Sequence, residues 1–202
     1  MEGDVKRVTE RGKENHGKRQ RLQRVGERDF DLVYSIMEEA FPYDERRSYG
    51  EQKQLLSDPK YQICGLFAPA DSALKAFITF YRLDGFVFAE HFATSTAYRN
   101  QGLGEGILQE LTETLEERIC LEVELPETEF AKRRIAFYQR NGFSLNPYPY
   151  VQPPISAGRA AIPLLLMTTG GTLTEREFLR IKETLYREIY HVDDLSFHGQ
   201  TE

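Results

Sequence analysis

The feature that most constrains this chain is a glycine-rich passage between a strand-like run and a helix-like run. Residues 99–106 read Arg-Asn-Gln-Gly-Leu-Gly-Glu-Gly, after the apolar run 86–94 and at the start of the amphipathic run 103–118. The first turn of a helix has unpaired N–H groups and a partial positive charge, and glycines let a ligand approach closely. Arg99 adds a permanent positive charge. The passage therefore predicts a phosphate-binding helix N-terminus.

Three interpretations of the glycines compete. A P-loop requires Lys-Ser/Thr after the last glycine, which is absent here. A dinucleotide-binding fold would use Glu122, 20 residues after Gly102, as the ribose acceptor. That fold, however, has the spacing Gly-x-Gly-x-x-Gly, whereas this chain has Gly-x-Gly-x-Gly. In that fold the glycines also follow the strand directly, whereas here they come about eight residues after its last apolar position. A flexible turn without a ligand is the third alternative, and the spacing alone leaves it open.

Length and composition indicate one soluble domain. The 202 residues are 40% hydrophobic and 29% charged and contain no long apolar run, so we expect no transmembrane helix. The N-terminus lacks the apolar core of a secretory signal. Cys64 and Cys120 are too few for a disulfide framework and have no metal ligand at close spacing. We expect a cytoplasmic protein that needs no metal and has no membrane partner.

The charge is unevenly distributed. Residues 1–28 contain nine Lys and Arg against five Asp and Glu, whereas the remainder contains 17 against 27. We expect residues 1–20 to be a flexible basic extension and residues 21–202 to form the domain. Nucleic-acid binding by the extension is the alternative, but the acidic body disfavours contact with phosphates. The acidic body of the chain suits cationic partners better.

The periodicity of the chain predicts a mixed α/β (α+β) fold. An antiparallel meander precedes alternating strands and helices, which gives six or seven strands flanked by helices. Predicted strands span residues 21–25, 61–68, 73–83, 86–94, 119–125, 143–145 and 162–168; predicted helices span residues 30–40, 49–56, 103–118, 132–141 and 172–191. Thr174 and Glu177 form a capping box for the last helix. Residues 146–161 form a proline-rich loop.

Two motifs resemble one known family. Arg99-x-x-Gly102-x-Gly104 is similar to the pyrophosphate-binding signature of the GNAT superfamily of acetyl-CoA-dependent N-acetyltransferases. The segment Phe137-Tyr138-Gln139-Arg140-Asn141-Gly142-Phe143 resembles the Tyr-x-x-x-Gly-Phe segment of the same family. The order of predicted elements over residues 21–168 also fits a single GNAT-like domain.

The resemblance implies a set of residues that bind acetyl-CoA. The strand end would offer backbone groups to the pantetheine arm, and the loop and first helical turn would hold the pyrophosphate. The implied residues are Phe92, Ala93 and Thr94 at the strand end, then Arg99, Asn100, Gln101, Gly102, Leu103, Gly104, Glu105 and Gly106. Tyr138 would be the general acid that protonates the leaving thiolate. The alternative for Tyr138 is a core ring with its hydroxyl at the rim.

Glu90 is the candidate general base. It interrupts the apolar run 86–92, and a period of two places it on the same face as Phe88 and Phe92. Partial burial would raise its pKa toward a useful range. The alternative is a structural pair with Arg134 or Arg82. The same period places His91 on the opposite face, where a structural role is expected.

Three further residues are candidates for binding the acceptor. Glu122 and Glu124 share one face of a strand that we expect to be central, where they would attract a cationic amine. Tyr150 lies in the proline-rich loop, which is stiff enough to form an acceptor wall. The apolar positions of the last helix indicate packing on the domain or a homodimer contact.

Together these observations predict an N-acetyltransferase. It would transfer the acetyl group of acetyl-CoA to a primary amine, small or peptidic, by direct attack. The presence of both Glu90 and Tyr138 favours an enzyme over the alternative, a non-catalytic acyl-CoA-binding sensor or scaffold.

Overall fold

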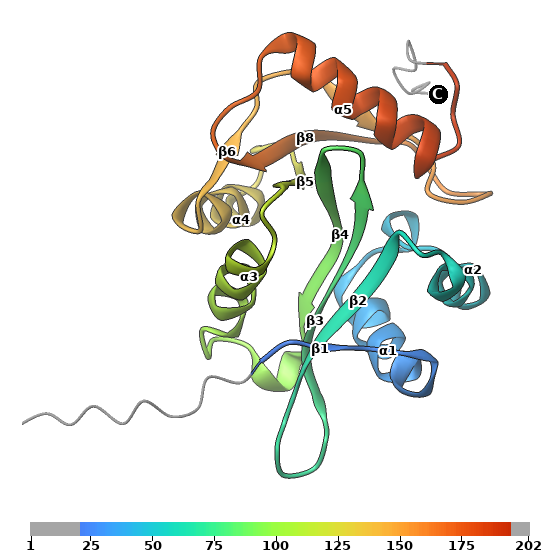
Figure 1. Ribbon diagram of the computed structural model, residues 1–202, viewed down its shortest axis with the longest axis vertical. Coiled ribbons are helices and arrows are strands. Elements are labelled where there is room, and N and C mark those ends of the chain that lie inside the picture. The colour runs from blue at the N-terminus through green and yellow to red at the C-terminus, as the bar shows by residue number, and fades with distance from the viewer. Residues whose placement is uncertain (1–20, 195–202) are drawn as a thin grey trace, which may run out of the picture.

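One mixed sheet of eight strands organises residues 21–194, the part of the chain that the computed structural model describes. The order is β1-β2-β3-β4-β5-β8-β6, and β7 also pairs with β8 (Figure 1). The strands are β1 (Gln23–Arg24), β2 (Tyr61–Phe67), β3 (Leu74–Leu83), β4 (Phe86–Thr94), β5 (Arg118–Glu124), β6 (Phe143–Leu145), β7 (Tyr150–Gln152) and β8 (Ile162–Thr169). The predicted extension 1–20 and the last residues of the predicted domain, 195–202, lie outside the described residues.

Five α-helices cover the two faces of this sheet. They are α1 (Phe30–Ala40), α2 (Tyr49–Gln54), α3 (Leu103–Thr114), α4 (Glu129–Arg140) and α5 (Glu175–Glu188). Buried residues of α1 and α5 share one apolar cluster with the sheet, and those of α3 and α4 share a second cluster on the other face. The sheet is thus the middle of three layers. Within the described residues, no helix is long and apolar enough to span a membrane.

The mixed sheet, the antiparallel meander and the flanking helices confirm the predicted fold class. The capping box of Thr174 and Glu177 begins α5, as predicted. Helix α5 buries its apolar positions, including Phe178 and Leu185, against its own sheet, so these side chains serve packing within the domain. Helix α3 ends at Thr114, earlier than expected, because Leu115 adopts an extended backbone and turns the chain toward β5.

The proline-rich loop contains a strand that the periodicity did not predict. Tyr150 and Gln152 of β7 pair antiparallel with Leu164 and Ile162 of β8. A strand of three residues is too short to show a clear alternation, and the surrounding prolines favoured a loop. This pairing anchors the loop to the edge of β8 that is opposite β5.

A β-bulge in β4 changes which side chains share a face. Thr79 of β3 pairs with His91, and the next residue, Phe80, pairs with Ala89, so Glu90 has no partner in this register. One extra residue reverses the alternation. Phe88 therefore packs in the cluster of α1, whereas Phe92 packs in the cluster of α3.

The bulge also corrects two expectations from the sequence. Glu90 does not share a face with both Phe88 and Phe92, and His91 does not point away from Glu90. His91 packs edge-on against Phe41, which lies after α1, with ring centroids 4.8 Å apart. Its Nδ1 lies 3.2 Å from Glu90 Oε2. The period-two argument failed because it assumed a regular strand.

The same bulge marks the point where the sheet opens. Strands β4 and β5 run parallel, and their pairing extends only from Phe86–Arg118 to Ala89–Leu121. Beyond this point β5 continues along β8 as far as Glu124, while β4 follows β3 to Thr94. The two central strands therefore separate, and the edge of β4 toward β5 is left open.

Candidate functional site

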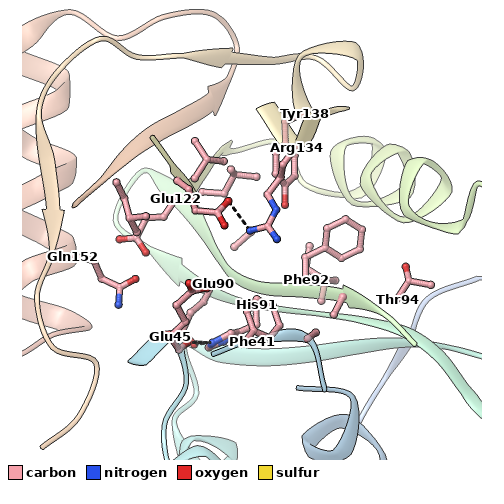
Figure 2. Close-up of a pocket in the computed structure, with 18 of the residues that line it drawn as sticks. Phe41, Glu45, Glu90, His91, Phe92, Thr94, Glu122, Arg134, Tyr138 and Gln152 are labelled. Carbon is pink, nitrogen blue, oxygen red and sulfur yellow. Dashed lines mark hydrogen bonds and ion pairs between the residues drawn. The ribbon is translucent and has the colours of Figure 1, made fainter. Parts of the chain in front are cut away.

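A cavity of about 330 Å³ lies where β4 and β5 separate (Figure 2). Both strands, α4, the segment after α1 and the chain around β7 contribute to its walls. The lining residues include Phe41, Glu45, Glu90, His91, Phe92, Ala93, Thr94, Arg99, Leu121, Glu122, Val123, Glu124, Phe130, Arg134, Tyr138, Gln152 and Ile155. The structure thus brings the strand end, Arg99, Tyr138 and three predicted glutamates to one cavity.

The loop that leads into α3 contributes Arg99 to the cavity wall. Arg99 lines the cavity, and its Nε donates a hydrogen bond to the Thr94 carbonyl at 3.4 Å. Gly102 is the N-cap of α3 with a φ of 72°, and no side chain caps the helix there. A residue with a Cβ would be strained at that φ. The first turn of α3 is therefore available to an anion.

Gly104 is needed for close packing rather than for its backbone angle. A Cβ at this position would lie 3.2 Å from the ring of Phe137 and 3.5 Å from the ring of Phe92. Gly104 therefore lets the first turn of α3 approach both α4 and β4. Gly106, by contrast, has open space around it. The remaining predicted residues of this loop, Asn100, Gln101 and Glu105, are exposed, and Leu103 is half-buried.

Tyr138 projects from α4 into the cavity. Its ring packs edge-on against Phe137 and Phe143, with centroids 5.4 and 5.6 Å away. Figure 2 shows its hydroxyl directed into the cavity. Burial raises the pKa of Tyr138 to about 12, so the hydroxyl remains protonated at neutral pH. Both the packing role and the predicted acid role fit this placement.

Glu90 forms a buried ion pair with Arg47. The distance from Arg47 Nη1 to Glu90 Oε1 is 2.7 Å, and neither side chain is more than 7% exposed. Burial alone would raise the pKa of Glu90, but Arg47 and then His91 lower it to about 2. The expected rise in pKa is therefore wrong, and a carboxylate with this pKa is a weak base.

The partner of Glu90 also differs from the sequence alternatives. Arg134 pairs with Glu124, and Arg82 pairs with Glu117 on the surface. Arg47 comes from the segment between α1 and α2, 43 residues before Glu90. No local pattern in the sequence links these two positions.

His91 has a fixed orientation beside this pair. The distance from its Nε2 to the Glu45 carbonyl oxygen is 2.8 Å. A carbonyl only accepts, so Nε2 carries the proton of this bond. His91 is almost fully buried, and its packing on Phe41 supports the predicted structural role.

Glu122 has the opposite electrostatic environment. Tyr150 donates a hydrogen bond to its Oε1 at 2.5 Å, and the Tyr190 hydroxyl lies 2.9 Å from each carboxylate oxygen. Burial raises the pKa of Glu122 to about 7, although the two hydroxyls partly oppose this rise. Glu122 therefore titrates near neutral pH while facing the cavity. The sequence marked Glu122 only as an acceptor-binding residue.

Of the other two acceptor-binding candidates, Glu124 lines the cavity and Tyr150 does not. Glu124 lines the cavity, but it pairs with Arg134 at 2.9 Å, and both side chains are about one-third exposed. Tyr150 is buried behind Glu122 and does not line the cavity. Gln152 and Ile155, from the same connection, form that wall instead.

Glu45 is a further acidic group that lines the cavity. Burial, and then the charge of Glu124, raise the pKa of Glu45. Each effect indicates a carboxyl group whose negative charge would be stabilised by a cation. No cluster of three or more metal-ligating side chains occurs among residues 21–194. The cavity thus combines carboxyl groups, which favour a cation, with Arg99, which favours an anion.

Comparisons with known proteins agree with this arrangement. The profile described as "Acetyltransferase (GNAT) family" matches residues 30–143. A solved structure described as an acetyltransferase of the GNAT family from Bacteroides thetaiotaomicron is 36% identical, with a TM-score of 0.76. The match covers 85% of this chain and 99% of that one. A comparison with curated proteins finds no significant match.

More distant structures share the fold. The ribosomal-protein-S18-alanine N-acetyltransferase from Escherichia coli is 21% identical, with a TM-score of 0.53, over 76% of this chain and 95% of that one. Arabidopsis thaliana NAA60 in complex with acetyl-CoA is 15% identical, with a TM-score of 0.56, over 73% and 96%. At these identities the likeness concerns the architecture alone.

Proposed function

The chain belongs to the GNAT family of acetyltransferases and is an N-acetyltransferase, and we propose that it transfers the acetyl group of acetyl-CoA to a primary amine by direct attack. One observation carries the proposal. A single cavity joins Arg99, next to the uncapped start of α3, to a carboxyl group, Glu122, whose pKa is about 7. The proposed acceptor is a small or peptidic amine, and the proposed location of the enzyme is the cytoplasm.

The residues around β4 and α3 fit acetyl-CoA. The edge of β4 that has separated from β5 includes Phe92, Ala93 and Thr94, and all three line the cavity. Their backbone groups would bind the pantetheine arm as a strand would. The amides of residues 101–106 and the Arg99 guanidinium would hold the pyrophosphate. When bound, acetyl-CoA supplies the thioester that the amine attacks.

Glu122 is proposed as the general base in place of Glu90. An amine arrives at neutral pH as an ammonium ion and must lose a proton before it attacks. A base with a pKa of about 7 accepts that proton far better than a group with a pKa of about 2. The Arg47–Glu90 pair instead holds the bulge that separates the strands.

Tyr138 is proposed as the general acid. Its hydroxyl points into the cavity from the side of α4, opposite the wall that contains Gln152 (Figure 2). With a pKa of about 12 it is still protonated at neutral and moderately alkaline pH, where Glu122 is ionised. It can therefore donate to the thiolate as the carbon–sulfur bond breaks.

Glu45 and Glu124 are proposed to attract the acceptor. Both line the cavity, as do the rings of Phe41 and Phe130. Carboxylates in a narrow cleft raise the local concentration of a cation, and the aromatic rings suit the alkyl part of an amine. The E. coli structure named above is an alanine N-acetyltransferase, which makes peptide N-termini a sensible part of a substrate panel.

The test begins with titration of the full chain with acetyl-CoA by calorimetry, followed by thiol release with a panel of amines. We expect amine-dependent release, and we expect Glu122→Gln to lower kcat by about a hundredfold or more with little change in acetyl-CoA affinity. Glu183→Gln on the surface of α5 is the matched control and should leave kcat unchanged. Full activity of Glu122→Gln would contradict the proposed base. Binding without release from any amine would instead support an acyl-CoA-binding module.

A further inference from the structure

The carboxylate of Glu122 is held by hydroxyls from a part of the chain that the family match does not include. The match ends at residue 143, whereas Tyr150 belongs to β7 and Tyr190 follows α5. Oε1 of Glu122 lies 2.5 Å from the Tyr150 hydroxyl and 2.9 Å from the Tyr190 hydroxyl. Oε2 lies 2.9 Å from Tyr190 alone. Oε2 therefore keeps more of its capacity to accept a proton.

Helix α5 fixes both donors. The Tyr186 hydroxyl on α5 donates to the Val151 carbonyl of β7 at 2.5 Å, and the rings of Tyr150 and Tyr186 lie 5.9 Å apart. The backbone N–H of Tyr190 donates to the Leu185 carbonyl at 3.1 Å. Both tyrosine rings are buried. Their hydroxyls are thus placed by the packing of α5 and the residues after it on the sheet.

We propose that Tyr150 and Tyr190 are positioning residues of the reaction, which keep the Glu122 carboxylate ionised and orient its Oε2 toward the acceptor amine. The inference rests on the proposed role of Glu122 as the base. It gives α5 and the segment after it a part in catalysis in addition to packing. A hydrogen bond to the charged form of a carboxyl group favours that form, so each hydroxyl opposes the effect of burial.

The charged groups around Glu122 do not by themselves keep its carboxylate ionised. Glu90 of β4 and Arg47 of the α1–α2 segment both act on the pKa of Glu122, in opposite directions. Burial and the nearby carboxylate raise the pKa values of Tyr150 and Tyr190 well above the ordinary value. Both tyrosines therefore remain hydrogen-bond donors throughout the range in which Glu122 titrates.

The experiment compares full-length wild type with Tyr190→Phe and Tyr150→Phe by two readouts. Carbon-detected NMR of the glutamate carboxyl groups gives the pKa of Glu122, assigned with Glu122→Gln, and kcat/KM is followed against pH with one amine. We expect each variant to raise the pKa of Glu122 by about one unit and to move the acidic limb of the profile by the same amount. Activity at alkaline pH should be retained.

The control is Tyr148→Phe, which removes a hydroxyl that donates to the Leu173 carbonyl and does not contact Glu122. It should move neither readout. An unchanged pKa of Glu122 in folded Tyr190→Phe and Tyr150→Phe would overturn the inference. A pKa that rises while the activity profile stays fixed would remove Glu122 as the base, which is a failure of the proposed function and not of the contacts. If one of the two tyrosine variants does not fold, the pKa of Glu122 and the pH profile of the other variant test the inference.

Discussion

The two sides of the separated strands contain the same residue type in opposite states. Glu90 of β4 and Glu122 of β5 are both shielded from water, yet the pKa of Glu90 is about 2 and that of Glu122 is about 7. Arg47 neutralises the first, whereas the neutral hydroxyls of two tyrosines bind the second. The comparison shows that the partner decides whether a buried carboxylate is structural or available for proton transfer.

The largest predicted effect tests the structural role of the buried Arg47–Glu90 ion pair. Arg47→Met leaves the Glu90 carboxylate buried without its cation, and we expect a loss of about 3–5 kcal/mol in the free energy of unfolding. Urea denaturation measures it. Arg82→Met, which breaks the exposed pair with Glu117, is the matched control and should cost about 1 kcal/mol or less. Equal losses in both variants would show that burial of the Arg47 pair is unimportant.

The two carboxylates should also give opposite pH dependences of stability. The pKa of Glu90 is lowered on folding, so its contribution is present above its unfolded value of 4.5 and is lost as the pH falls toward about 2. The pKa of Glu122 is raised, so its contribution is present below 4.5 and is lost as the pH rises through about 7. Over each of these pH ranges the free energy of unfolding should change by up to about 3 kcal/mol.

Denaturation curves at several pH values separate these two contributions. Glu122→Gln should abolish the decline in stability between pH 4.5 and 7 and leave the decline at acidic pH in place. Glu90→Gln should do the reverse, on a lower overall stability because Arg47 loses its partner. The same slope in both variants would contradict the assigned pKa values.

Tyr138 extends the comparison, because its hydroxyl titrates outside the two pH ranges in which Glu90 and Glu122 titrate. Tyr138→Phe should lower kcat by between about ten- and a thousandfold, as expected when a general acid is lost. Since Glu122 is untouched, the acidic limb of the kcat/KM profile should remain at the same pH. Steady-state kinetics over a pH series measure both quantities. Wild-type turnover would return Tyr138 to a packing role.

The sequence was sufficient where the determinant of structure is local. The apolar spacing of α1, the capping box of α5 and the glycines before α3 each act within a few residues, and the predicted elements formed there. Tyr138 was placed through a motif, and it does line the cavity.

The sequence was insufficient where the determinant is a long-range contact. The bulge at Glu90 depends on pairing with β3, the Arg47 pair joins residues 43 apart, and the Tyr190 contact joins residues 68 apart. Glu90 and Glu122 are both glutamates in apolar strands, and only the fold shows which one faces a cation. The sequence therefore could not show that the pKa of Glu90 is lowered and that of Glu122 raised.

The smallest predicted effect concerns Glu124, a third carboxylate in the same cavity. It is paired with Arg134, as Glu90 is with Arg47, but both side chains are about one-third exposed, so water and salt screen the pair. Glu124→Gln should raise KM for a cationic amine by only about two- to fivefold at low ionic strength, less at high salt, and leave kcat unchanged. Kinetics at two salt concentrations measure this. A loss of kcat comparable to that of Glu122→Gln would mean that exposure does not separate the two glutamates of β5, and that both take part in proton transfer.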